Sequence, residues 1–217
     1  MAADDVKILL RIVKKADRGG APRSFGLGHV FLALYRIDDG TPLSREKLGT
    51  CLGLGGGAVK SLVSKLRDYN LIRTLKVGNV LSDEGLRFVR SLRSLIPVVS
   101  EVSVRNLSTG RKNVAAIIRG IDKVGLDPIS LRDEAIRAGG TGATTLFFDG
   151  SLIRVPGVYD DLSTVSNLDV KALTQLGLQG GDVILIAGGT NVQTASVACA
   201  TVAMGFVSGS PRRIYGH

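Results

Sequence analysis

The chain has 217 residues, a net charge of +9, 44% hydrophobic residues and 22% charged residues. These are the values of an ordinary soluble protein, and the length suits two domains. The charge is uneven, because 17 basic and 9 acidic residues precede Val98, which gives that half a net charge of +8. A polyanion partner for the first half follows, and nucleic acid is the commonest one.

The two cysteines, Cys51 and Cys199, are far apart and imply no disulfide framework. A reducing, cytoplasmic location is therefore expected. Both thiols are expected to be small core residues. The longest apolar run, Ala195 to Val207, is too short to span a membrane, and no lipidation motif is present. We therefore expect no membrane partner.

Residues 1–23 predict a helix followed by a linker, the Gly- and Pro-containing segment Asp17 to Arg23. The helix either packs on the next domain or serves as a dimer arm, and the sequence does not decide between the two. Ser24 is predicted to cap the following helix. That helix has an inner face of Leu27, Val30, Phe31 and Leu34, with His29 on the other side.

Residues 24–97 predict a winged helix-turn-helix, mainly helical with a short β-wing. Its signature is the stretch Leu43 to Leu81, which reads as helix, glycine turn, helix and hairpin. The second helix has apolar residues at the spacing of one helical face, and Val77 to Asn79 is the predicted hairpin turn. The apolar residues are Val59, Leu62, Val63 and Leu66.

The outward side of this second helix is basic, which favours DNA binding over a merely solvated face. The glycines from Gly53 to Gly57 fit the pattern G-x-G-x-x-A only out of context, because a helix and not a strand precedes them. They are interpreted as the turn before the recognition helix. The predicted groove residues are Gly57, Lys60, Ser61 and Ser64, and the predicted phosphate contacts are Ser44, Arg45, Lys65 and Lys76.

A further helix is expected from Ser82 to Leu95, with an arginine stripe that is either solvated or faces phosphate. Ile96-Pro97 marks the domain boundary. Residues 98–207 then predict an α+β domain with the element order ββαββαβα, in which Ser130 caps a helix ending at Arg137. Residues 208–217 are expected to form a loose tail.

Two glycine-containing loops of the second half are candidates for binding a small anionic metabolite, through backbone N–H groups and a helix N-terminus. Tight connections rich in glycine are also common without any ligand. The candidate ligand-binding residues are Gly139, Thr141, Gly142 and Thr144 in one loop, Gly188, Gly189 and Thr190 in the other, and the cations Arg119 and Arg132.

No catalytic residues, metal site or cofactor are predicted. The two histidines, His29 and His217, are isolated, and no Ser/His/Asp arrangement or metal-ligand spacing can be assembled around them.

The run Ile117 to Gly157 resembles the C-terminal domain of a family of uncharacterised archaeal proteins. The similar residues include Arg119-Gly120, Arg132-Asp133, Gly142 to Thr145 and Asp149-Gly150. That family joins an N-terminal winged helix to an α+β domain, so the resemblance covers most of the chain. It implies a transcriptional regulator.

The sequence thus predicts a regulator that binds double-stranded DNA, as a homodimer, with a second domain for small-molecule sensing or dimerisation. One alternative is an enzyme whose second domain acts on a phosphorylated or carboxylated small molecule. A second alternative is a protein–protein adaptor that uses the winged helix.

Overall fold

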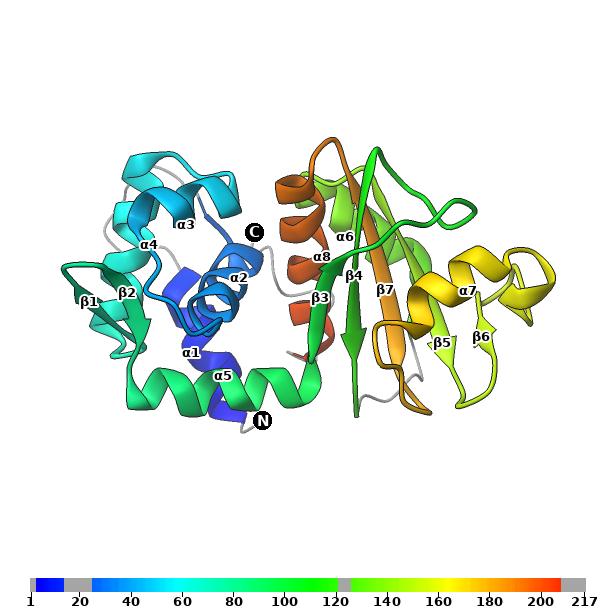
Figure 1. The fold of residues 1–217 in the computed structure, drawn as a ribbon, viewed down its shortest axis with the longest axis horizontal. Coiled ribbons are helices and arrows are strands. Elements are labelled where there is room, and N and C mark those ends of the chain that lie inside the picture. The colour runs from blue at the N-terminus through cyan, green and yellow to red at the C-terminus, as the bar shows by residue number, and fades with distance from the viewer. Residues whose placement is uncertain (1–2, 14–24, 121–125, 208–217) are drawn as a thin grey trace. The chain divides into compact units, whose positions relative to one another are not determined.

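The computed structural model describes residues 3–13, 25–120 and 126–207. The chain divides into two compact units, Met1–Arg93 and Ser94–His217 (Figure 1). The mixture of helices and sheets confirms the predicted α+β class. The predicted linker at Asp17–Arg23, the Ser24 cap and the predicted tail at 208–217 lie outside the described residues.

Three helices followed by an antiparallel hairpin form the centre of the N-terminal unit, in the order predicted for a winged helix-turn-helix. A helix precedes this core and another follows it. The first helix packs against the second, with Leu9 and Ile12 fully buried. The elements are α1 (Ala3–Val13), α2 (Leu27–Ile37), α3 (Arg45–Leu52), α4 (Gly56–Asp68), β1 (Ile72–Leu75), β2 (Gly78–Leu81) and α5 (Asp83–Leu95).

The apolar stripes predicted from helical periodicity face the core of this unit. Helix α2 buries its predicted inner face, and α4 buries all four of its predicted residues. His29 lies outside that stripe, and its Nδ1 accepts a hydrogen bond from the backbone N–H of Gly26. Burial lowers the pKa of His29 to about 4, so the ring is neutral at physiological pH.

The hairpin turn differs from the prediction by one position. Leu75 pairs with Gly78, so the turn consists of Lys76 and Val77, and Gly78 and Asn79 belong to β2. Gly78 has φ +142°, and a Cβ there would come within 2.9 Å of the Leu43 backbone. The glycine is therefore required where β2 closely approaches the segment before α3, and not for the turn.

Asn79 joins the hairpin to the segment that leads into α3. Its backbone exchanges two hydrogen bonds with Leu43, and its Nδ2 donates to the Leu43 carbonyl at 2.9 Å. Its Oδ1 accepts from the Thr74 hydroxyl at 2.8 Å. The side chain is 1% exposed, so one buried amide links β1, β2 and the start of α3.

The C-terminal unit follows the predicted order ββαββαβα, which is confirmed. Its five strands form one antiparallel sheet in the order β3-β4-β7-β5-β6. The elements are β3 (Val98–Glu101), β4 (Lys112–Ile118), α6 (Pro128–Arg137), β5 (Gly142–Phe148), β6 (Ile153–Arg154), the short 3₁₀ helix η1 (Leu162–Thr164), α7 (Asn167–Thr174), β7 (Val183–Gly189) and α8 (Val192–Val207).

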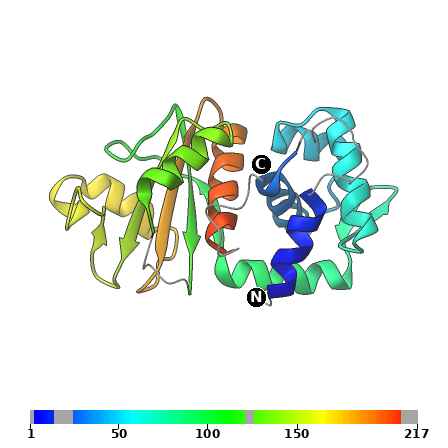
Figure 2. The same cartoon turned by 180° about the vertical axis from the view of Figure 1, so that it is seen from behind.

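Helices α6 and α8 cover one face of this sheet, and α7 with η1 covers the other (Figures 1 and 2). Alternate residues of β7 supply both cores. Ile184 and Ile186 pack with Leu162 and Leu173 on the α7 side. The Cys199 thiol of α8 donates to the Leu185 carbonyl on the other side.

Two sequence expectations about small features are wrong. Cys51 is exposed, because its position in α3 is turned away from the core residues Leu48 and Leu52. Cys199 is buried as expected, and burial raises the pKa of its thiol to about 12. The cap of α6 is Asp127 and not Ser130, because Pro128 begins the helix at its first position.

Candidate nucleic-acid interface

The turn between α3 and α4 presents the start of α4 to solvent. Gly53 ends α3 in the left-handed region at φ 66°, and a Cβ on Gly49 would lie 2.9 Å from the Leu54 carbonyl oxygen. These two glycines serve the turn. In contrast, Gly56 and Gly57 have open space around them, and α4 has no side-chain cap. Backbone N–H groups at the start of α4 are thus accessible to an anion.

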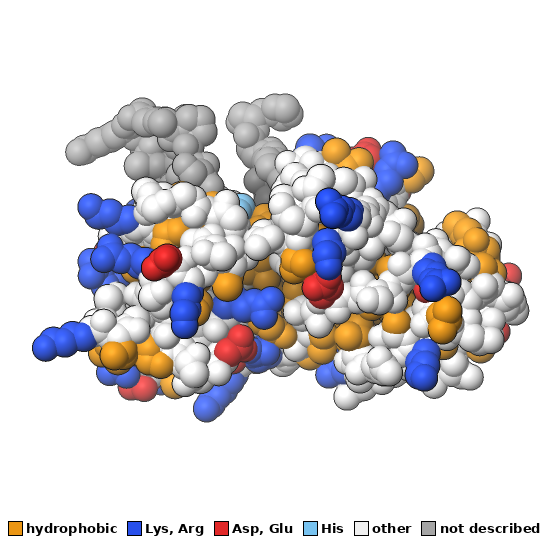
Figure 3. Space-filling model, turned by 45° about the horizontal axis from the view of Figure 1, so that its top comes forward, with side chains coloured by type: hydrophobic (Ala, Val, Ile, Leu, Met, Phe, Trp, Pro, Cys, Tyr) orange, Lys and Arg blue, Asp and Glu red, His pale blue; other side chains and the backbone are white. Residues whose placement is uncertain are grey.

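The predicted basic face of α4 points away from the core. Lys60, Ser61 and Arg67 are exposed, while Ser64 and Lys65 are half-buried. Basic side chains project from the N-terminal unit, at the left of Figure 3, with fewer acidic ones between them. This face has the character of a surface that binds a polyanion.

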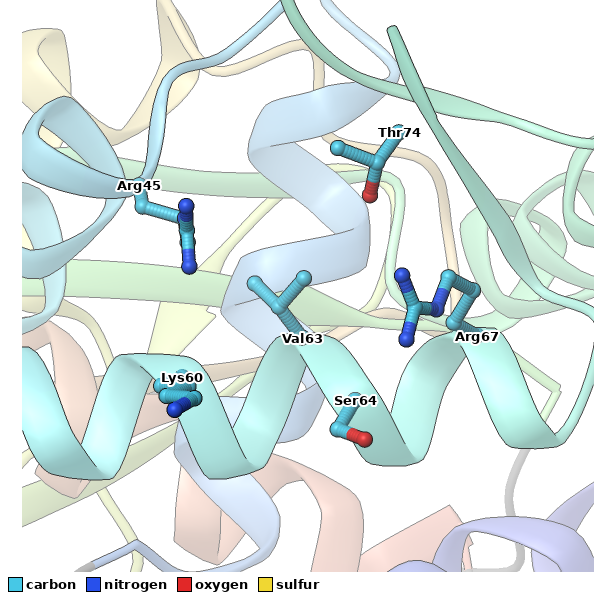
Figure 4. A pocket seen from close by; sticks show the side chains of 6 residues that line it. All are labelled: Arg45, Lys60, Val63, Ser64, Arg67 and Thr74. Carbon is cyan, nitrogen blue, oxygen red and sulfur yellow. The ribbon is translucent and has the colours of Figure 1, made fainter.

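A hollow of about 280 Å³ opens on this face, and we call it the basic hollow. In Figure 4 the side chains of Arg45 and Arg67 approach it from opposite sides of Val63, and Thr74 lies above. Residues of α3, α4 and β1 are thereby brought together. The residues that line the basic hollow are Arg45, Lys60, Val63, Ser64, Arg67 and Thr74.

The structure gathers only some of the predicted DNA-binding residues into this hollow. Arg45, Lys60 and Ser64 line it. The other predicted residues lie outside its lining, among them Ser44, whose hydroxyl caps α3 by accepting from the Lys47 N–H, and Lys76 in the hairpin turn. Gly57, Ser61 and Lys65 are on α4 beside the hollow.

Sequence reasoning missed Arg67 and Thr74 as site residues. Arg67 could have been found, since it stands seven residues after Lys60 and so shares its helical face. Thr74 could not, because only the tertiary fold brings β1 beside α4.

Within the described part of the chain, the cations of the basic hollow have no carboxylate partner. Among the described residues, no ion pair involves Arg45, Lys60 or Arg67. Three like charges around one hollow repel one another, and an anion would relieve that repulsion.

The arginine stripe of α5 behaves differently. Arg87 pairs with Glu84 on its own helix. Nε of Arg93 lies 2.6 Å from Oδ2 of Asp38, and its guanidinium lies 3.9 Å from the centre of the Tyr35 ring. Two of the three arginines therefore have partners within the unit, and Arg90 remains exposed.

In the C-terminal unit, the two glycine loops predicted to bind a metabolite meet each other. The Thr141 N–H donates to the Gly188 carbonyl at 2.9 Å. A Cβ on Gly188 would lie 2.4 Å from a backbone atom of Thr109, and one on Gly140 would lie 2.7 Å from Cβ of Ala198. Close packing of three backbone segments accounts for these glycines. Gly142, Gly188 and Gly189 are buried, whereas Gly139, Thr141 and Thr190 are exposed and Thr144 is half-buried.

The two cations predicted beside these loops lie apart. Arg132 lies near Gly142, because a Cβ built on Gly142 would lie 3.8 Å from Cγ of Arg132. The guanidinium group of Arg132 pairs with Asp133. Arg119 directly follows the C-terminal end of β4 and binds Asp182, which directly precedes β7. Gly188 lies near the opposite end of β7. The structure therefore does not bring Arg119 together with the glycine loops.

Two buried polar atoms on facing elements of this unit find no hydrogen-bond partner among the described residues. They are Oε1 of Glu134 on α6 and Oγ1 of Thr145 on β5. Burial raises the pKa of Glu134 to about 7, against a weaker opposing effect of Arg137. Across the part of the chain that the structure describes, no three His, Cys, Asp or Glu residues gather as a metal site. Within the same residues, no helix is long and apolar enough to cross a membrane.

Comparisons with known proteins bear on the fold. Residues 109–206 match a family model described as a domain of unknown function, DUF4443. This range contains the run Ile117 to Gly157 that resembles the archaeal family. A solved structure, the hypothetical protein PH0730 from Pyrococcus horikoshii OT3, has a TM-score of 0.73 and 24% sequence identity, over 86% of this chain and 95% of that one. No curated protein matches. Neither description states an activity, so the likeness concerns the fold alone.

Proposed function

We propose that this chain is a DNA-binding transcriptional regulator whose N-terminal unit contacts double-stranded DNA through α4. The observation that carries the proposal is the basic outward face of α4, which lies beside the start of α3 and the hairpin and whose cations form no ion pair among the described residues. A second helix of this kind fits the major groove, and the adjoining elements then meet the phosphate backbone. Lys65 on α4 and Lys76 at the hairpin turn are the outer phosphate contacts.

Binding of random-sequence duplex DNA, followed by fluorescence anisotropy at several salt concentrations, tests this function. We expect affinity that falls steeply as salt rises, because bound cations release counterions from DNA. The double variant Lys65→Ala/Lys76→Ala should bind more weakly and with a shallower salt dependence. Lys171→Ala removes an exposed cation from α7 in the other unit and is the matched control. Wild-type protein that shows no salt-dependent binding would overturn the proposal and favour a protein–protein adaptor.

The proposal assigns dimerisation to the C-terminal unit. DNA operators with two-fold symmetry are bound by protein dimers. Helix α6 has two exposed isoleucines seven residues apart, Ile129 at 65% and Ile136 at 48% exposure, which could form an apolar contact between two copies. Light scattering at increasing concentration should detect a dimer, and Ile136→Glu should shift it toward the monomer. A monomer at high protein concentration would contradict this assignment.

Sensing of a small anionic metabolite remains part of the same proposal, at the junction of the loops that contain Thr141 and Thr190. A thermal-shift screen of metabolites tests it, because a ligand of the folded state raises the unfolding temperature. The two cysteines are unpaired, which supports the cytoplasm as the location.

A further inference from the structure

We infer that the basic hollow is a seat for one phosphate group, which in the complex with DNA is a phosphate of the backbone. The inference rests on the proposed function for the source of the phosphate, but the chemistry of the hollow supports it independently. Two guanidinium groups and one ammonium group surround the hollow, and none of the described residues that line it has a carboxylate. Guanidinium groups match the oxygens of a phosphate with paired N–H donors, and an ammonium group adds a compact charge.

The hydroxyl groups of Thr74 and Ser64, which both line the hollow, differ in their hydrogen bonds. The Thr74 hydroxyl donates its proton to Oδ1 of Asn79, so only its lone pairs face the hollow. It is thus an acceptor that can orient an arginine, and it is not a donor to phosphate. Within the residues that the structure describes, the Ser64 hydroxyl has no hydrogen-bond partner, so it can donate to a phosphate oxygen. Val63, only 6% exposed, forms an apolar floor that limits the depth of the seat.

This assignment changes the roles of residues on α4. Lys60, Ser64 and Arg67 follow the spacing i, i+4, i+7 and share the stripe that lines the hollow. If that stripe holds the DNA backbone, contact with base edges falls to the adjacent exposed side chain, Ser61. Lys60 and Ser64 are then positioning contacts, and they carry no sequence information.

Two measurements on the full chain test the seat. The first is calorimetric binding of inorganic pyrophosphate, which offers the same chemistry without a DNA helix. We expect Arg67→Ala to weaken this binding at least tenfold, with Lys60→Ala as a second variant and Lys171→Ala as the control. Arg67 is exposed, so its replacement should leave the thermal unfolding temperature close to that of the wild type.

The second measurement compares a duplex selected from a random library with an unselected duplex. Arg67→Ala should weaken binding to both by the same factor and reduce the slope of log affinity against log salt by about one. Ser61→Ala should instead change the ratio between the two duplexes. An unchanged affinity and slope for Arg67→Ala would overturn the seat.

The outcomes separate the seat from the proposed function. Pyrophosphate binding that depends on Arg67, in a protein that binds no DNA, would support the seat with a free phosphate compound as its ligand, and would overturn DNA binding. DNA binding that does not depend on Arg67 or Lys60 would support the proposed function but would overturn the proposal of a phosphate seat. Absence of both kinds of binding would overturn both.

Discussion

Nε of Arg119 lies 3.2 Å from Oδ1 of Asp182, and Nη2 of the same arginine donates to the Gly177 carbonyl at 2.9 Å. The Asp182 side chain is only 3% exposed, and it also accepts the Gln179 N–H. The arginine therefore neutralises a buried carboxylate where the chain enters β7.

Arg119→Ala should lower the free energy of unfolding of the C-terminal unit by about 3 kcal/mol, because it leaves the Asp182 carboxylate buried without its cation. Hydrogen exchange of the β7 amides measures this local stability. Arg132→Ala is the control, since the Arg132 side chain is 56% exposed and its loss should change stability by less than about 0.5 kcal/mol. Equal effects of the two variants would contradict the structural role of Arg119.

Gly188→Ala and Gly57→Ala should have opposite effects on stability. A Cβ at Gly188 would meet the Thr109 backbone at 2.4 Å, which forces the packed segments apart, whereas Gly57 has open space in a helix. We expect the first change to cost more than about 3 kcal/mol and the second to stabilise α4 by up to about 1 kcal/mol. Thermal unfolding followed by circular dichroism distinguishes them, and a neutral Gly188→Ala would show that the junction can relax.

The stability of the C-terminal unit should depend on the protonation of Glu134. Below about pH 4.5 the carboxyl group is protonated in both states. As pH rises toward 7, the unfolded chain loses this proton while the folded chain keeps it, so the contribution of Glu134 to stability falls by up to about 1.4 kcal/mol per pH unit. Above pH 7 the loss is constant.

Glu134→Gln should remove this part of the pH dependence and stabilise the unit at pH 8, by on the order of 2 kcal/mol. Hydrogen exchange of the β5 amides at pH 5 and pH 8 measures the difference. Asp133→Asn is the matched control, because the carboxyl group of Asp133, next to Glu134 in the sequence, is half-exposed. The prediction fails if Glu134→Gln and the wild type respond equally to pH.

Asp127 should be the more important of the two polar residues at the start of α6. Its carboxylate accepts the Ile129 N–H at 3.0 Å and so satisfies a backbone donor that the helix leaves open. Asp127→Ala should cost about 1 kcal/mol, and Ser130→Ala should cost only a few tenths. Chemical denaturation of the two variants tests the order, and a larger loss for Ser130→Ala would restore the cap predicted from the sequence.

Periodicity made much of this fold predictable from the sequence. The inner faces of α2 and α4 and the order of strands and helices along the second unit follow from apolar spacing and from turn residues, which are local signals. The order of the strands within the sheet, β3-β4-β7-β5-β6, does not. Contacts between distant segments carry no such signal. The partner of Arg119 and the position of Thr74 beside α4 depend on where the elements meet.

The candidate site was predictable to a similar extent. Lys60 and Ser64 could be assigned to one exposed face from their spacing alone, but their role could not, because the hollow that they share with Arg45 requires the packing of α3 and β1. DNA binding itself stays a prediction.

The hydrogen bonds of Asn79 have a consequence for how a ligand is received. Because this residue bonds to Leu43 and Thr74, the segment that delivers Arg45 and the strand that carries Thr74 cannot swing independently. These two walls of the hollow are therefore fixed relative to each other before any anion arrives. The rate of anion binding should then be limited by diffusion and by the ordering of the side chains of Arg45, Lys60 and Arg67. The rate of anion release should be limited by the breaking of the bonds from these side chains to the anion.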